Sequence, residues 1–225
     1  MNNHVTEQLT AAGAAIEHDS FDIIDREVAH HTYTSEQWPL VRRMIHATAD
    51  FEFNGLARFH PNAMRAGLAA VLRGDTAIVA DVEMICVGLS PIRLKHFGLT
   101  VRQFISDDDV IAQAKAEDST RAVQAMRKAH RLGLLDGAIV GIGNAPTALI
   151  ELVHLIREEG ARPALVIGMP VGFVSAAESK TLLAAQQDVP WIISEGRKGG
   201  STLVVAALHA FLSLAEARQR EAKAA

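Results

Sequence analysis

Ala138-Ile139-Val140-Gly141-Ile142 is followed at once by Gly143-Asn144-Ala145-Pro146-Thr147. The first five residues form a continuous apolar run, which is typical of a strand buried on both faces. Glycine, asparagine and proline then mark a tight turn into a helix, because proline is well placed in a first helical turn. The stretch therefore predicts a buried strand, a turn and a helix, the unit from which parallel sheets are built.

Similar units lie on both sides of this stretch. Short apolar runs predict strands at residues 76–80, 99–105, 138–142, 164–167 and 191–193. Helical patterns occupy residues 119–132, 146–159, 176–187 and 203–217. With right-handed crossovers, this alternation predicts an α/β fold: a doubly wound, parallel, five-stranded sheet in the flavodoxin-like order 2-1-3-4-5.

The first sixty residues predict an N-terminal helical segment in front of the sheet. Ser20 is a candidate cap for a short helix, and Ser35-Glu36 opens a second helix. A third helix begins at Pro61 and ends at Gly74. The charged, alanine-rich residues 216–225 are expected to fray. We expect residues 1–225 to form a single domain.

Composition excludes several classes of partner. The 225 residues carry 22 Lys and Arg against 26 Asp and Glu, a net charge of -4 with no basic run. Nucleic acid and anionic membrane surfaces are therefore not expected as partners. One cysteine, no signal-peptide pattern in residues 1–10 and no uninterrupted apolar span indicate a cytoplasmic protein.

Ligands of such sheets bind outside the carboxyl ends of the strands. The polar loops there leave two interpretations open, a ligand contact or an ordinary helix cap or surface loop. Asp81 and Glu83 can act as acid and base or cap a helix, and the basic loop at residues 194–201 can close over anions or be solvated. The candidate ligand contacts in these loops are Asp81, Glu83, Met84, Arg121, Asn144, Thr147, Lys180, Arg197 and Lys198.

Familiar catalytic motifs do not occur in this sequence. GxGxxG, GxSxG and HExxH are all missing, so we expect no nicotinamide or flavin cofactor, no nucleophile elbow and no metal site.

His46 is the candidate proton donor. At about 100° per residue, it lies on the side of its helix opposite the apolar residues Val41, Met44 and Ile45. An outward histidine is usually only solvated, yet imidazole is the side chain best suited to proton transfer near neutral pH. Asp50, four residues later, can orient the ring if the helix continues that far.

At these positions the chain resembles the precorrin-8X methylmutase family. The resemblance extends over nearly the whole chain, and its most specific segments are Gly143-Asn144-Ala145-Pro146-Thr147-Ala148-Leu149 and Gly168-Met169-Pro170-Val171-Gly172-Phe173-Val174. The other segments are residues 20–24, 41–47, 81–84, 119–121, 176–180 and 196–201.

The resemblance implies an isomerase of cobalamin biosynthesis, which moves a methyl group from C-11 to C-12 of precorrin-8X or cobalt-precorrin-8. It implies no cofactor and a homodimer that has its sites at the interface and holds its tetrapyrrole product tightly. The family's histidine, serine and arginine match His46, Ser20 and Arg121. An arginine often precedes that serine in the family, whereas Asp19 stands here and puts one carboxylate contact in doubt.

Within this interpretation, His46 is the general acid, Ser20 orients the ring, and Arg121 binds peripheral carboxylates. Lys180, Arg197 and Lys198 extend the carboxylate contacts by loop position alone. Two alternatives are a corrinoid carrier without chemistry, which only a conversion assay separates from an enzyme, and a flavodoxin-like domain that binds phosphate at residues 141–147.

Overall fold

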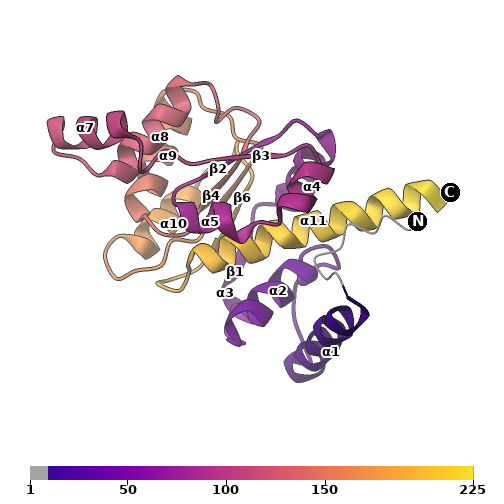
Figure 1. The fold of residues 1–225 in the computed structure, drawn as a ribbon. Coiled ribbons are helices and arrows are strands. Elements are labelled where there is room, and N and C mark those ends of the chain that lie inside the picture. Colours follow the sequence, from indigo (N-terminus) through magenta and orange to yellow (C-terminus); the bar gives the residue numbers. More distant parts are fainter. Residues whose placement is uncertain (1–9, 225) are drawn as a thin grey trace.

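The structure, a computed structural model, describes residues 10–224 and is built around one six-stranded sheet (Figure 1). Its strands run in the order β1-β6-β5-β4-β2-β3. All neighbours pair in parallel except β1, which pairs antiparallel with β6. The strands are β1 (Ala57–Phe59), β2 (Ala77–Ala80), β3 (Thr100–Arg102), β4 (Ile139–Ile142), β5 (Leu165–Gly168) and β6 (Trp191–Ser194).

The five predicted parallel strands all occur, but the expected strand count was wrong. The sixth strand, β1, has no clear signal in the sequence, because it is a three-residue edge strand in which Arg58 interrupts the apolar pattern. Its assignment depends on pairing with Ile192, Ile193 and Ser194, more than 130 residues later. The expected strand at residues 99–105 is shortened to β3.

Alternate residues of the central strands face two different cores. Ile78, Ile139 and Ile167 point into one core, whereas Val79 and Val140 point into the other. Helices therefore cover both faces, as the apolar strands predict. The first face is covered by α2 (Trp38–Thr48), α4 (Ala63–Arg73), α5 (Glu83–Gly88), α6 (Pro91–His96) and α11 (Ser201–Ala224), and the second by α7 (Asp108–Ala116), α8 (Arg121–Arg131), α9 (Pro146–Glu158) and α10 (Ala176–Ala184).

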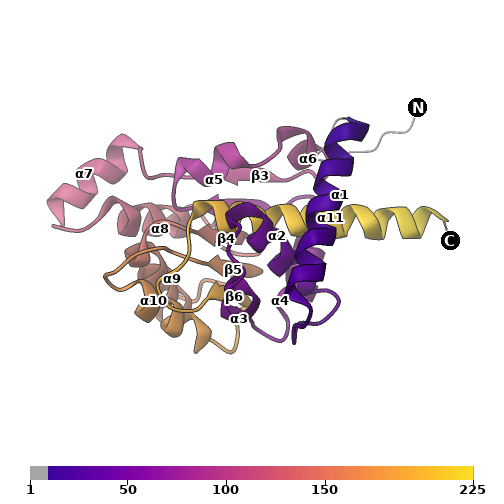
Figure 2. The same cartoon turned by 90° about the horizontal axis from the view of Figure 1, so that it is seen from below.

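The N-terminal segment consists of α1 (Ala11–Val28), α2 and α3 (Phe53–Leu56). Figure 2 shows α1 and α2 crossing in front of α11, and α2 packs closely on both of these helices. Ser20 was predicted to cap a helix, and this is wrong, because Thr10 caps α1 and Ser20 lies in the middle of it. The Ser20 hydroxyl donates to the Ile16 carbonyl at 2.7 Å.

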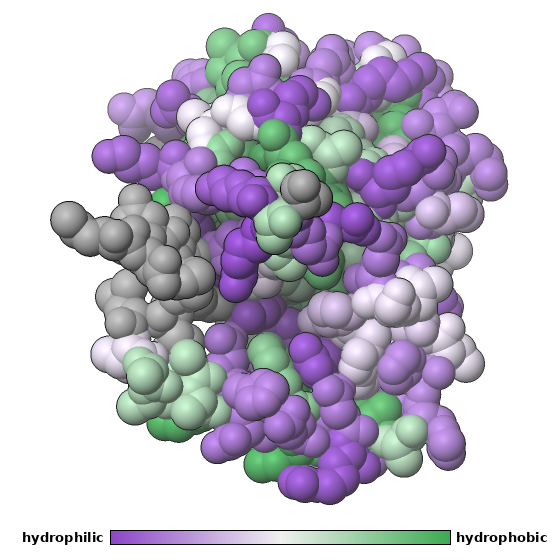
Figure 3. Space-filling model, turned by 90° about the vertical axis from the view of Figure 1, so that its right-hand side faces the viewer, coloured by the Kyte–Doolittle hydropathy of each residue, from purple (hydrophilic) through white to green (hydrophobic). Residues whose placement is uncertain are grey.

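Helix α11 crosses the first face of the sheet and continues past it (Figure 1). The tail was expected to fray from residue 216, whereas the helix continues to Ala224. Among the described residues, α11 alone is long and apolar enough to cross a membrane, yet 67% of its most apolar window is buried within the protein. The end of the molecule that carries its last turns is mostly hydrophilic (Figure 3). The expectation that residues 1–10 hold no signal peptide falls, except for Thr10, outside the described residues.

Candidate functional site

His46 lies on the outward side of α2 and is exposed, as its position on the helix predicts. It borders a groove of about 450 Å³ between α1 and α2 on one side and α5 and α11 on the other. The groove is lined by Glu17, Arg43, His46, Ala47, Met84, Val87, Gly88, Thr202, Val205, Ala206 and His209. His46 is therefore an exposed imidazole at the edge of a cavity that is large enough to take part of a flat ring.

A second cavity, of about 260 Å³, lies on the other side of the same imidazole. Ser20 and His46 both line it, together with the exposed apolar residues Ile23 and Phe51. The Phe21 ring contacts His46 edge to face, with ring centroids 5.2 Å apart. Helix α1 therefore brings the predicted serine and histidine to one site.

Asp50 does not orient the His46 ring. Helix α2 ends at Thr48 because Ala49 adopts a left-handed conformation, so Asp50 has turned away from the helix axis. Its carboxylate instead accepts from the Lys198 amine and from the Glu52 backbone N–H. The hydrogen bond from Lys198 holds the pKa of Asp50 below its usual value.

The charged residues of the groove lie on its α1–α2 side. Arg43 donates to Glu17 at 2.8 Å, and both side chains are mostly buried. The charges of this pair cancel, so it adds no net positive charge beside His46. The guanidinium still offers N–H donors to a ligand that carries carboxylates. Arg43 was not among the predicted site residues, although it lies three residues, close to one helical turn, before His46.

Met84 lines the groove, whereas Asp81 has a structural position. Met84 and Val87 of α5 are 61% and 72% exposed and supply apolar surface to the groove. Glu83, the first residue of α5, is exposed. Asp81 is buried, and its carboxylate accepts from the backbone N–H groups of Gly143, Asn144 and Ala145.

The Asp81 carboxylate therefore anchors the loop that precedes α9. Burial raises the pKa of this carboxyl group, and the three N–H donors oppose that shift. A buried carboxylate whose acceptors face three backbone donors is placed to hold this loop, so the structure favours a structural role for Asp81 over acid–base work.

Arg121, Asn144 and Thr147 lie together at the starts of α8 and α9, outside the His46 groove. Arg121 and Asn144 are exposed. The Thr147 hydroxyl is 3.1 Å from that of Thr120, the cap of α8. Within one chain, these residues form a second polar region rather than a wall of the groove.

The three basic residues predicted from loop position have different surroundings. Lys180 is buried, and its amine donates to the Lys198 carbonyl at 2.8 Å, so it holds the loop rather than facing a ligand. The Lys198 amine pairs with Asp50 and Glu52, which neutralise it in this arrangement. Arg197 is exposed and lies over the Phe173 ring, 5.6 Å from its centroid.

Comparison with known proteins identifies the family of this chain. The family model described as precorrin-8X methylmutase matches residues 15–214. The chain is 49% identical over 216 residues to the cobalt-precorrin-8 methylmutase of Leptospira interrogans, covering 94% of this chain and 98% of that protein. It is 50% identical over 208 residues to the enzyme of the same name from Priestia megaterium, covering 92% and 91%.

A solved structure gives the same result. The precorrin-8X methylmutase of Thermus thermophilus superposes with a TM-score of 0.86 at 55% identity, covering 91% of this chain and 97% of that one. The chain belongs to the precorrin-8X methylmutase family. Methylmutases are isomerases, in which the migrating methyl group stays within one molecule.

A methylmutase site must hold its substrate in one orientation, and the groove offers both polar and apolar surface for this. His46 supplies an exposed imidazole, and Met84 and Val87 supply apolar surface for a ring face. In residues 10–224, no group of three or more His, Cys, Asp or Glu side chains is placed to hold a metal ion.

The sequence analysis also missed His209, which lines the groove from α11. Its signal is present in the sequence, because His209, Ser213 and Glu216 lie four and three residues apart and form a polar stripe along the largely apolar part of α11. The partner of that stripe, Arg93, lies 116 residues before His209 and cannot be found from spacing.

Proposed function

We propose that this protein converts precorrin-8X or cobalt-precorrin-8 into hydrogenobyrinate or cobyrinate by moving the methyl group from C-11 to C-12. The observation that carries the proposal is the position of His46, exposed between two cavities that contain Met84 and Ser20 respectively. The relatives named as cobalt-precorrin-8 methylmutases and the solved precorrin-8X methylmutase support it.

In this mechanism, His46 acts as the general acid toward the ring near the migrating methyl group. Positioned proton transfer of this kind typically contributes about 10²–10⁴ in rate. Because the methyl group only changes position within the molecule, the remaining acceleration comes from holding the ring and from electrostatics. Ser20 orients the macrocycle from α1, with its hydroxyl shared between the ligand and the Ile16 carbonyl.

Arg121 and Arg197 bind peripheral carboxylates, and Glu83, Asn144 and Thr147 supply further polar contacts. All five lie at or beyond the carboxyl ends of the strands, where ligands of such sheets bind. Lys198 can bind a ligand carboxylate only if it gives up its ion pairs with Asp50 and Glu52. Lys180 can do so only if the loop that its amine holds opens.

The protein functions as a cytoplasmic homodimer of single-domain chains with the sites at the interface. The separation of Arg121 from the His46 groove within one chain supports a site that a second copy completes. The exposed apolar side chains of Val171, Phe173 and Val174, beside Arg197, offer surface for such a contact. The five parallel strands, in the order β3-β2-β4-β5-β6, support a flavodoxin-like core with β1 added at its edge.

The direct test is conversion by the purified chain. Incubation with precorrin-8X, and separately with cobalt-precorrin-8, is expected to produce the corrin chromophore in at least one case, followed by visible absorption. Comparison of the two rates identifies the substrate. Binding of both compounds without conversion of either would contradict the enzyme and favour a corrinoid carrier.

A further inference from the structure

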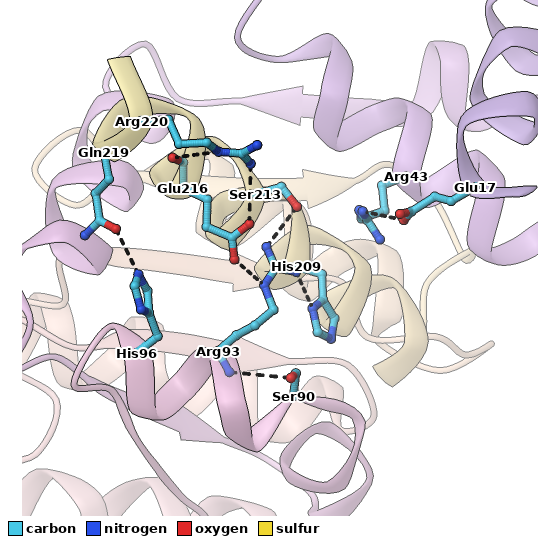
Figure 4. Close-up of polar contacts among 10 residues, drawn as sticks. All are labelled: Glu17, Arg43, Ser90, Arg93, His96, His209, Ser213, Glu216, Gln219 and Arg220. Atoms are coloured by element: carbon cyan, nitrogen blue, oxygen red, sulfur yellow. Dashed lines mark hydrogen bonds and ion pairs between the residues drawn. The ribbon is translucent and has the colours of Figure 1, made fainter. Parts of the chain in front are cut away.

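A buried polar cluster connects α6 to the floor of the groove (Figure 4). The Arg93 side chain is 1% exposed, and its Nε donates to Glu216 Oε1 at 3.0 Å. Its Nη2 donates to Ser213 Oγ at 2.9 Å. Burying a guanidinium is costly unless its N–H groups find partners, and α11 supplies these partners from successive turns.

The third contact of Arg93 determines the protonation of His209. Arg93 Nη1 lies 3.2 Å from His209 Nδ1. A guanidinium has only donors, so Nδ1 must accept and carries no hydrogen. The ring hydrogen is therefore on Nε2, which donates to the Gly88 carbonyl at 3.1 Å. His209 is held as a neutral imidazole in one tautomer, with both ring nitrogens in use.

Gly88 is the last residue of α5 and touches α11 at a second point. A Cβ atom at position 88 would lie 2.7 Å from Cγ2 of Val205, closer than real Cβ contacts allow. The two helices approach here because residue 88 has no side chain. The hydrogen bond from His209 and this close contact together fix the distance between α5 and α11.

We propose that His209 is a positioning residue that sets the width of the groove for a flat, carboxylated macrocycle. It does so through α5, which carries Met84 and Val87 on the groove wall. This inference rests on the proposed function, and it gives the two histidines of the groove different roles. His46 is exposed and carries the proton, whereas His209 holds the wall that the ring contacts.

The test compares His209→Ala with His209→Gln in the full-length chain. Loss of the bond to Gly88 is expected to raise KM and the dissociation constant of the corrin product about tenfold, with kcat within about threefold. Glutamine carries both an acceptor and an N–H donor, so His209→Gln is expected to restore both constants to within about threefold of wild type.

Gly88→Ala is a second variant, which leaves His209 unchanged and covers the case in which His209→Ala fails to fold. Its new methyl group meets Val205, so the same rise in KM and weaker product binding are expected. Val205→Ala added to Gly88→Ala removes that contact and should recover part of the loss, with Val205→Ala alone as the control.

Wild-type KM and product affinity in folded His209→Ala or Gly88→Ala would overturn the inference. So would a His209→Gln variant as impaired as His209→Ala, or a fall in kcat alone, which indicates direct chemistry by His209. Failure of the proposed function is a separate outcome. A wild-type chain that binds the corrin product without converting its precursor would refute the enzyme, and product affinities of the variants would still test the positioning role.

Discussion

Lys180 is a buried residue that holds one of the loops near the site in place. Its amine is buried and donates to the Lys198 carbonyl, which also accepts from the Ser194 hydroxyl. Burial lowers the pKa of Lys180 to about 8, because desolvation penalises the charged amine. The residue therefore holds the loop between β6 and α11 at a cost in stability that depends on pH.

This cost predicts a specific pH dependence. The folded chain holds the Lys180 proton less tightly than the unfolded chain, whose pKa is 10.5, so unfolding takes up a proton between pH 8 and 10.5. The free energy of unfolding should therefore rise with pH across that range. Urea unfolding of Lys180→Met at several pH values should show a smaller rise than wild type. Identical slopes for the two proteins would contradict the pKa shift.

The direction in which a single side chain points can be predicted from the sequence where it depends only on the local helical period. The outward position of His46 follows from 100° per residue along α2. Asp81 could not be interpreted in this way, because its three N–H donors lie 62 to 64 residues later in the loop before α9. Asp50 was misjudged because helix α2 ends two residues before it.

At the scale of elements, the loops are held together by close backbone contacts. A Cβ atom at Gly143 would lie 2.6 Å from the Ser201 Cα and 2.7 Å from its backbone nitrogen, so the loop after β4 packs directly on the start of α11. Helix α11 carries one wall of the groove, so this contact also places Thr202 and Val205.

Gly143→Ala should therefore lower the free energy of unfolding by about 1–3 kcal/mol, because backbone must shift to admit the methyl group. Gly55→Ala is the matched control, since nothing lies within 4 Å of a Cβ atom there and its φ is not positive. Chemical denaturation of both variants measures the difference. Equal stability of the two would argue against close packing between the loop and α11.

Lys198 connects two further elements, because its amine reaches Asp50 and Glu52 after α2 from the loop after β6. This contact holds the pKa of Asp50 below its ordinary value of 3.8 and that of Lys198 above 10.5. The stabilisation from this ion pair is therefore fully present between pH 3.8 and pH 10.5. It is lost in acid as the pH falls through the lowered pKa of Asp50, and in base as the pH rises through the raised pKa of Lys198.

Thermal unfolding of Lys198→Met should show a lower midpoint than wild type near pH 7. The difference between the two midpoints should narrow at high salt, and in acid as the pH falls through the lowered pKa of Asp50. Lys115→Met removes the same charge from an exposed position on α7 and serves as the control. A gap that is equally large in acid would show that Lys198 acts through packing rather than charge.

The elements themselves were largely predictable, because buried parallel strands read as continuous apolar runs and their helices carry clear ends such as Pro146 and Gly74. What was missed depends on distant partners. β1 exists only through its pairing with β6, and Arg93 becomes a core residue only because α11 passes over it.

At the scale of the whole molecule, the groove and the polar region around Arg121 are separate within one chain. If a second copy brings them together, light scattering should give twice the mass of one chain. His46→Ala and Arg121→Ala are each expected to be impaired alone. Mixed under conditions of subunit exchange, they should regain turnover, because one of the two sites in a mixed dimer is intact. A monomeric mass, or no recovery after verified exchange, would contradict a shared site.

His46 is proposed to supply the proton that makes methyl migration fast, and its replacement tests this most directly. The measurement is conversion by His46→Ala beside wild type, with His154→Ala on α9 as the matched histidine control and with product affinity measured for all three. If His46 is the general acid, His46→Ala should lose about 10²–10⁴ in kcat while binding the corrin product within about threefold of wild type. Wild-type turnover by His46→Ala would contradict it.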